Sequence, residues 1–351
     1  MIHRDFWRGR RVLLTGHTGF KGAWLATWLL DLGCEVHGVG LAPQTTPSLF
    51  ELSGLSHRLH HVVEDLRSPD TAARALERSA PDVVLHLAAQ PILRRALRDP
   101  LETFETNVMG TVHLLEAVRH CPSVAAVVVV TSDKCYEEHT DGAAYREGDP
   151  LGGRDPYSAS KGCQEIVAHA YRRSYLGGRL ATARAGNVIG GGDWSEDRIV
   201  PDAVRALIGG RELTLRSPGS VRPWQHVLDP LAGYLRLAER LSAGSGADRS
   251  WNFGPAELDP PTVSDLVNRV HDAWGRGSWA PVTDPDAGSE AAVLRLDATL
   301  AREHLGWAPR IDFDRAVRLT VEWYRDVLER GADAFDLTRR QIREYEATGS
   351  A

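Results

Sequence analysis

The sequence predicts an α/β protein built on a doubly wound parallel sheet with a smaller C-terminal substrate-binding lobe, on three observations. Short apolar runs alternate with helical stretches through the first half of the 351 residues. The runs are apolar on both faces, which is typical of parallel strands covered by helices on both sides. The first run leads directly into a glycine-rich turn and a helix, as in sheets that bind nucleotides.

The first half is expected to contain five strands and four helices. The strands are predicted at Arg11–Leu14, Glu35–Val39, Asp82–Ala88, Ala125–Thr131 and Leu180–Ala185. The helices are predicted at Gly22–Leu32, Pro69–Ser79, Leu101–Arg119 and Ser158–Tyr175. Parallel strands need crossover connections, which are nearly always right-handed, so these helices are expected to cover the sheet.

After Gly186, loops rich in glycine and proline separate shorter elements. Further helices are predicted at Val227–Leu241, Val263–Ala273 and Arg315–Arg330. The first domain is expected to span residues 1–186 and to be completed by about residues 224–245, whereas the lobe takes residues 187–223 and 246–351. A ligand cleft is expected between the two.

Composition excludes several classes of protein. A hydrophobic content of 42% with 25% charged residues is ordinary for a globular chain and excludes global disorder. No apolar run is long enough to span a bilayer, and the N-terminus lacks a signal-peptide pattern, so no membrane association is expected. The net charge of -6 argues against nucleic-acid binding. Four widely spaced cysteines predict free thiols and a cytoplasmic location.

The turn after the first strand has glycines spaced G-x-x-G-x-x-G. The residues expected to bind a dinucleotide there are Gly16, Thr18, Gly19, Phe20, Lys21 and Gly22. Glycine lets the backbone approach a pyrophosphate, and the helix N-terminus offers unpaired N–H groups to that anion. The end of the second strand, Val39–Ala42, supplies no ribose-binding acid. Because no arginine lies between Arg11 and Arg58 to bind a 2′-phosphate, NAD is favoured over NADP.

Two further motifs indicate redox chemistry. Tyr157 and Lys161 form a Y-x-x-x-K pair, whose spacing places both on one helix face. A cationic lysine there is expected to lower the pKa of the tyrosine, so that the phenol can take a hydroxyl proton. The preceding strand ends in Ser132, Asp133 and Lys134, and an extra acid and base beside an oxidation site suit an elimination. Only Lys21, Lys134 and Lys161 are lysine in the whole chain, and each falls in one of these motifs.

These motifs resemble the nucleotide-sugar 4,6-dehydratases of the extended short-chain dehydrogenase/reductase superfamily, and within them the group that acts on CDP-glucose. The resemblance spans residues 6 to 226. Its segments are Phe6–Trp7, Gly16–Trp24, Pro47–Glu51, Thr131–Tyr136, Asp155–Lys161, Arg184–Trp194 and Arg222–His226. The serine–aspartate–lysine triplet is the form found in that group, whereas dTDP-glucose dehydratases usually carry threonine, aspartate and glutamate.

The resemblance implies further cofactor contacts and a mechanism. The contacts are Asp65 and Leu66 near the adenine, the run Leu87, Ala88, Ala89 and Gln90, and Asn107, which shapes the site. Ser132 supplies the active-site hydroxyl, and Tyr157 takes the proton of the sugar 4-OH during oxidation at C4. Asp133 then protonates the departing 6-OH. Lys134 either removes the C5 proton as a neutral amine or stabilises the enolate as a cation.

The substrate is expected to be a nucleotide sugar, CDP-glucose first. The residues expected to hold it are Asn187, Arg198, Arg222, Trp224 and His226, with Trp194 as an alternative stacking residue. A homodimer is expected through the helices at Leu101–Arg119 and Ser158–Tyr175, as the resemblance implies. The histidines show no metal-ligand spacing along the chain, so no metal is expected.

Three alternatives remain at this point. The chain is a dehydratase for dTDP-glucose or GDP-mannose, an NAD-dependent nucleotide-sugar 4-epimerase, or a non-catalytic dinucleotide-sensing protein on the same fold. Asp133 and Lys134 argue against an epimerase, because epimerisation has no leaving hydroxyl to protonate. The presence of Ser132, Tyr157 and Lys161 together argues against a protein that has lost its catalytic activity.

Overall fold

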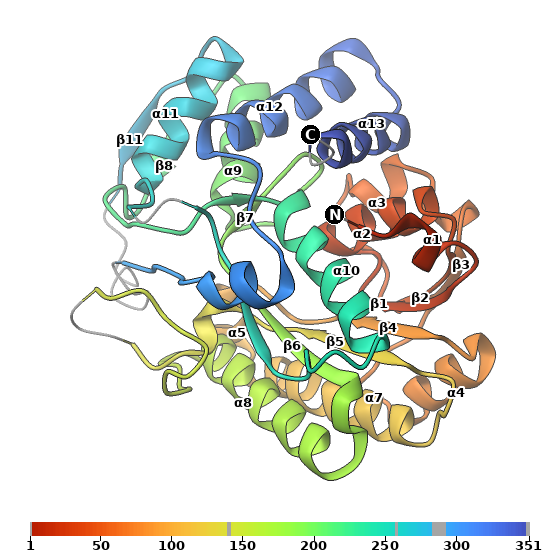
Figure 1. The fold of residues 1–351 in the computed structure, drawn as a ribbon. Helices are drawn as coiled ribbons and strands as arrows, with labels where there is room; N and C mark the ends of the chain where they lie inside the picture. Colours follow the sequence, from red (N-terminus) through yellow and green to blue (C-terminus); the bar gives the residue numbers. More distant parts are fainter. Residues whose placement is uncertain (1, 139–141, 257–258, 283–292, 349–351) are drawn as a thin grey trace.

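A seven-stranded parallel sheet forms the centre of the computed structural model, which describes residues 2–138, 142–256, 259–282 and 293–348 (Figure 1). From one edge to the other its strands are β10 (Ser250–Phe253), β6 (Leu180–Ala185), β5 (Ala126–Val130), β4 (Val83–His86), β1 (Arg11–Thr15), β2 (Glu35–Gly40) and β3 (His60–Val63). The predicted fold class is confirmed. Strand order reverses between β1 and β4, so a crevice opens at their carboxyl ends.

Burial on both faces explains why the central strands read as continuous apolar runs. Every residue of β4, β5 and β6 is buried. Along β1, Val12 and Leu14 pack into one core and Leu13 into another on the opposite face, as the twofold alternation of a strand requires.

Helices cover both faces (Figure 1). One face carries α2 (Phe20–Asp31) and α10 (Leu228–Ser242), and the other carries α4 (Pro69–Ser79), α7 (Gly110–Arg119) and α8 (Pro156–Tyr171). None of the helices in the described parts of the chain combines the length and the apolarity needed to cross a bilayer.

The long helix predicted over Leu101–Arg119 is assembled from three pieces. It begins as α6 (Pro100–Phe104), continues through a π-helical turn at Glu105–Met109, and ends as α7. The helix predicted to end at Tyr175 also closes in a π-helical turn, Arg172–Leu176, after α8. Turns of this kind add a residue without ending the helix, so apolar spacing in the sequence does not reveal them.

The second half supplies further elements around the sheet and against α2. They are β7 (Val188–Ile189), α9 (Ile199–Ile208), β8 (Leu213–Leu215), β9 (Gln225–His226), α11 (Val263–Trp274), β11 (Trp279–Pro281), α12 (Phe313–Arg330) and α13 (Ala334–Ala347). Strand β10 lies in the range predicted for the lobe, yet it pairs with β6 in the main sheet. The division into two domains remains a prediction, and residues 257–258, 283–292 and 349–351 of the predicted lobe lie outside the described residues.

Candidate functional site

A cavity of about 640 Å³ lies at the carboxyl edge of the sheet, where α2, α8 and the loops of the second half meet. It is lined by nearly all of the residues predicted from the sequence. They are Gly16, Thr18, Gly19, Phe20, Lys21, Gly22, Asp65, Leu66, Leu87, Ala88, Ala89, Gln90, Ser132, Asp133, Lys134, Tyr157, Lys161, Asn187, Arg198, Arg222 and Trp224. The two predicted residues that do not line it are Asn107 and His226.

The glycine loop has the shape of an anion-binding turn. Gly16 has a φ of 72°, and a Cβ there would lie 2.7 Å from the backbone nitrogen of Ala88. A Cβ on Gly22 would lie 2.1 Å from the Gly16 carbonyl oxygen, so helix α2 can start against the loop only if this residue is glycine. Gly19 caps α2 without a side-chain hydrogen bond, which leaves the first N–H groups of the helix directed at the cavity. This donor set fits the pyrophosphate of a dinucleotide.

His17, inside the same loop, was not singled out from the sequence. It is fully buried, its ring meets Phe50 edge-on, and its Nε2 lies 2.7 Å from Nδ1 of His61. Burial, and then the neighbouring His61, lower the pKa of His17 to about 4. A Cβ on Gly38 would lie 2.5 Å from the His17 ring, so the ring occupies the space beside β2 that a side chain at position 38 would need.

Buried amides order the far side of the loop region. The side chain of Asn107 accepts a hydrogen bond from Gln90 N at 2.8 Å and donates to Gln90 O and to the hydroxyl of Ser160. Asn107 therefore fixes the backbone at Gln90, which lines the cavity, although Asn107 itself does not; its role in shaping the site stays a prediction. At the rim, Asp65 accepts hydrogen bonds from Arg67, which outweigh its partial burial and hold its pKa below the usual range.

Ser132 connects the groups at the end of β5. Its hydroxyl donates to Asp133 Oδ1 at 2.9 Å and accepts from Lys134 N at 3.2 Å, and Ser132 lies near enough to Tyr157 to favour the ionised phenol. Tyr157 lies in the first turn of α8, which starts with a proline and is capped by the side chain of Asp155. A short 3₁₀ helix, Asp133–Cys135, turns the acid and the lysine into the cavity.

Burial changes the protonation behaviour of these groups. It raises the pKa of Asp133, whose Oδ2 is buried and has no hydrogen-bond partner among the described residues. Burial, and then the charge of Lys21, lower the pKa of Lys161 to about 7. Burial also raises the pKa of Tyr157, although Arg198 and Ser132 oppose it. The predicted lowering of the tyrosine pKa is therefore not present in this structure, because desolvation outweighs the neighbouring charges.

Lys21 lies among the reactive groups as well as in the glycine loop. It occupies the first turn of α2 and lines the cavity. Burial and the charge of Arg198 lower its pKa to about 8, while Asp133 and Asp193 oppose the shift. The charge of Asp133, the acid that Ser132 contacts, therefore acts on Lys21. The sequence motif alone did not indicate that Lys21 lies near Asp133.

The second half of the chain contributes cationic, aromatic and amide side chains to the cavity lining. Arg222 is buried and donates to Val221 O, and its charge acts on Asp133. Arg198 donates to Pro91 O at 2.9 Å, and Trp224 donates to Pro261 O at 3.2 Å. Asn187 lines the cavity where β6 ends.

Two arginines that line the cavity were missed from the sequence. Arg94 and Arg216 both line the cavity and both lie near Asp197, at 3.8 Å and 2.9 Å between nitrogen and oxygen. No signal distinguished them, because almost every basic residue in the chain is arginine.

His226 was expected to contact the substrate, and the structure places it elsewhere. It is fully buried in β9, and its ring lies edge-on to Trp24 at 5.9 Å between centroids. Burial lowers its pKa to about 3, so the ring is neutral and packs as part of the core. Trp224, two residues earlier and just before β9, lines the cavity.

Comparison with known proteins agrees with this geometry. Residues 12–254 match the family described as the NAD dependent epimerase/dehydratase family. The chain is 43% identical over 98% of both chains to the CDP-glucose 4,6-dehydratase of Salmonella typhimurium, and 34% identical over 70% of both chains to the dTDP-glucose 4,6-dehydratase of Streptomyces antibioticus. Among solved structures, a dTDP-glucose 4,6-dehydratase from Streptomyces venezuelae with NAD and TYD bound has a TM-score of 0.75 and 26% identity. That match covers 90% of this chain and 97% of the other.

Proposed function

This chain belongs to the NAD dependent epimerase/dehydratase family, and we propose that it is a CDP-glucose 4,6-dehydratase. The reaction oxidises the sugar at C4, eliminates water across C5 and C6, and reduces C6, which gives CDP-4-keto-6-deoxy-D-glucose. The observation that carries the proposal is the buried carboxyl of Asp133, which accepts a hydrogen bond from Ser132 and lines the same cavity as Tyr157. An oxidation site with a raised-pKa acid next to it is equipped to expel a hydroxyl group.

NAD fits the glycine loop, the rim at Asp65 and the wall at Gln90. When bound, NAD supplies the reversible acceptance of hydride on which oxidation and reduction of the sugar depend. The chain's own contribution is to hold the pyrophosphate at the N-terminus of α2, and to keep the reacting groups in a cavity of limited volume.

The proton transfers fall to the groups at the end of β5 and the start of α8. Tyr157 takes the proton of the sugar 4-OH, with Ser132 orienting its hydroxyl. Asp133, whose pKa burial raises, gives a proton to the departing 6-OH, which leaves as water. Lys134 lines the same cavity, where it acts either as the base at C5 or as a cation beside the enolate. Replacement of Lys134 by methionine separates the two, because a base is required for exchange of the C5 hydrogen with solvent.

Lys21 is proposed to set the charge around this centre. Its charge disfavours protonation of Lys161 and favours ionisation of Asp133. A compact amine that can lose its proton fits this place better than the ever-charged and broader guanidinium of arginine.

The nucleotide part of the substrate is proposed to bind the cationic residues that line the cavity. Arg198 and Arg222 are the proposed partners of the diphosphate, since guanidinium groups bind phosphate oxygens in pairs. Arg94 and Arg216 add to this cationic lining, and Asn187 and Trp224 are proposed to contact the remainder of the nucleotide sugar.

Exposed apolar side chains support a homodimer. Leu101 is 67% exposed, Met109 is 44% exposed and Ile166 is 59% exposed, and they lie on the neighbouring segments α6 to α7 and α8. Burying these side chains against a second copy would remove them from water. Replacing Ile166 by glutamate should shift the mass measured by light scattering from dimer to monomer. The four free cysteines fit the reducing cytoplasm, the proposed location.

The test of the proposed function is direct. Purified protein with NAD is incubated separately with CDP-glucose, dTDP-glucose, GDP-mannose and UDP-glucose, and 4-keto-6-deoxy products are identified by mass spectrometry. Product from CDP-glucose is expected. Product from dTDP-glucose alone would overturn the base assignment, epimerised UDP-galactose from UDP-glucose would favour an epimerase, and no reaction with any of the four would end the enzyme proposal.

A further inference from the structure

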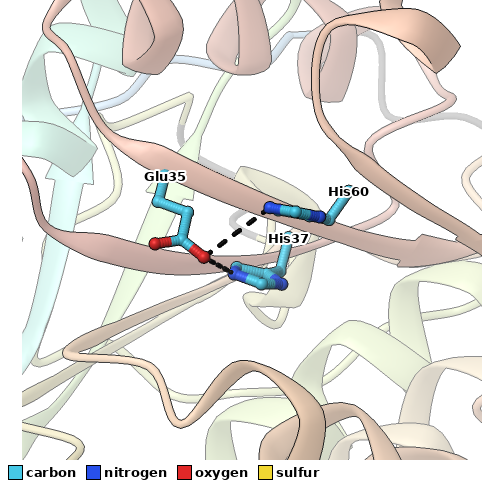
Figure 2. A group of neighbouring side chains, drawn as sticks. All are labelled: Glu35, His37 and His60. Atoms are coloured by element: carbon cyan, nitrogen blue, oxygen red, sulfur yellow. Dashed lines mark hydrogen bonds and ion pairs between the residues drawn. The ribbon is translucent and has the colours of Figure 1, made fainter.

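A second group of chemically active side chains lies at the opposite end of the sheet from the cavity. Glu35 and His37 are two residues apart on β2, so both project from the same face. The register pairs His37 with His60 of β3, which brings the second imidazole beside the first. Figure 2 shows the Glu35 carboxylate directed at the edges of the two rings.

The geometry brings three metal-binding atoms together. The ligand atoms of the three residues all lie within 4.8 Å of one another. Glu35 Oε1 is 2.8 Å from His37 Nε2 and 3.6 Å from His60 Nε2. The rings are stacked at 4.4 Å between centroids and 15° between planes, so both Nε2 atoms face the same side (Figure 2). Neighbouring ligands of a tetrahedral zinc ion are roughly 3.3 Å apart, as bond lengths of about 2.0–2.2 Å require, so small side-chain rotations suffice.

We propose that Glu35, His37 and His60 bind a Zn²⁺ ion that links β2 to the edge strand β3. Two imidazole nitrogens and one carboxylate oxygen form a ligand set that zinc accepts, with water completing the tetrahedron. The side chains of Glu35 and His60 are 48% and 65% exposed, which leaves room for that water and for entry of the ion.

The surrounding charges permit a cation at this place. Arg11, whose backbone is in register with Glu35, brings a positive charge close to the group. It lies 3.9 Å from the carboxylate of Asp82, which offsets that charge. The spacing of histidines along the chain did not reveal the group, because its third ligand comes from the neighbouring strand.

The ion would act on strands that also serve the cavity. Glu35 and His60 are the first residues of β2 and β3, whereas Gly40 and Leu41 at the end of β2, and Asp65 after β3, line the cavity. Zinc bound at the amino ends of the two strands would hold the outermost strand of the sheet in place without touching the reacting groups. This role is independent of the proposed enzymatic function.

Calorimetric titration of untagged, chelator-treated protein with ZnCl₂ tests the proposal. One saturable equivalent is expected, together with a rise in Tm, because an ion that binds only the folded state stabilises it. His60→Ala should weaken binding at least about tenfold, since loss of a mere outer partner of a metal ligand already costs that much. Glu35→Gln, which preserves shape, should also weaken it. His57→Ala removes an exposed histidine outside the group and should bind as the unchanged protein does.

Two results would overturn the site. The first is the absence of saturable binding to the unchanged protein, or equal affinities for His60→Ala and His57→Ala. The second comes from Co²⁺ used in place of zinc: a thiolate-to-cobalt absorption band would assign the ion to cysteine instead. The expected cobalt spectrum has d–d bands without that charge transfer, and it should be lost in His60→Ala.

Discussion

Two buried carboxylates on neighbouring elements have pKa values shifted in opposite directions. Asp133 follows β5, and Glu165 lies in α8; they are 4% and 2% exposed. Burial alone raises the pKa of both groups. Asp133 keeps a raised pKa because one of its oxygens has no partner among the described residues, whereas the partners of Glu165 hold its pKa below the usual range.

The partners of Glu165 account for that difference. Arg184 donates to it at 2.7 Å, and the hydroxyls of Thr131, Thr182 and Ser250 donate at 2.5, 2.8 and 2.9 Å. This network ties α8 to β5, β6 and β10 and so fixes the framework on which the reacting side chains stand. Similar burial therefore goes with a raised pKa at Asp133 and a lowered pKa at Glu165, and the number of hydrogen-bond donors around each carboxylate accounts for the difference.

The largest expected effect is on catalysis. Asp133→Asn removes the proton donor but keeps the shape of the side chain, so turnover with CDP-glucose should fall about 10²- to 10⁴-fold. The unfolding midpoint should stay close to that of the unchanged protein, because no satisfied partner is lost. Unreacted CDP-4-ketoglucose should become detectable by mass spectrometry after quenching. Full activity in this variant would remove Asp133 from the mechanism.

Glu165→Ala should act on stability instead. It leaves the guanidinium of Arg184 buried without its carboxylate, which costs about 3–5 kcal/mol of unfolding free energy. Denaturant titration followed by circular dichroism measures the loss. Glu344→Ala, at an exposed position on α13, serves as the control and should change little. A loss no larger than that of the control would mean that the network contributes nothing to the framework.

Asp229 combines several hydrogen-bond donors, as Glu165 does, with a raised pKa, as Asp133 has. It should therefore make the free energy of unfolding depend on pH. It accepts hydrogen bonds from Arg310 N, Ile311 N and the hydroxyl of Tyr345, yet burial still raises its pKa to about 6. The folded state therefore holds the proton more tightly than the unfolded state, and this stabilisation is complete below pH 4 and lost as pH rises to about 6. The loss is about 2–3 kcal/mol. In Asp229→Asn the unfolding free energy should lack this fall, which parallel denaturant titrations from pH 4 to pH 7 would detect; equal slopes would contradict it.

The smallest effect tests how much a single donor matters. Ser250→Ala removes one of the three hydroxyl groups that bind Glu165 and should cost about 1 kcal/mol. Thermal unfolding monitored by calorimetry is sensitive enough to show it. No change would indicate that Arg184 and the two threonines satisfy the carboxylate without the serine.

Sequence patterns predicted the parts of the molecule that are local in the chain. The glycine loop at Gly16–Gly22 and the pair Tyr157–Lys161 carry their geometry in their spacing, so both were found. The edge strand β3 was not predicted, because it is short and only partly buried. Strand β10 was also missed, since its four residues follow a loop and resemble no continuous apolar run.

Features that depend on packing between distant segments could not be predicted from the sequence. His226 has the residue type of a site but lies in the core, where its fully buried ring packs against Trp24. Lys21 faces Asp133 only after α2 and β5 are brought together by the sheet. Arg94 and Arg216 lie far apart in the sequence and come together beside Asp197 at the cavity only in the folded chain.

The contact between His17 and Gly38 also restricts how this sequence can change over evolutionary time. With a Cβ at position 38 only 2.5 Å from the imidazole, a substitution there is tolerated only after His17 has been replaced by something smaller. If position 38 changes first, its new side chain overlaps the ring of His17 in the intermediate sequence. The histidine at position 17 thus requires glycine at position 38, which lies 21 positions further along the chain.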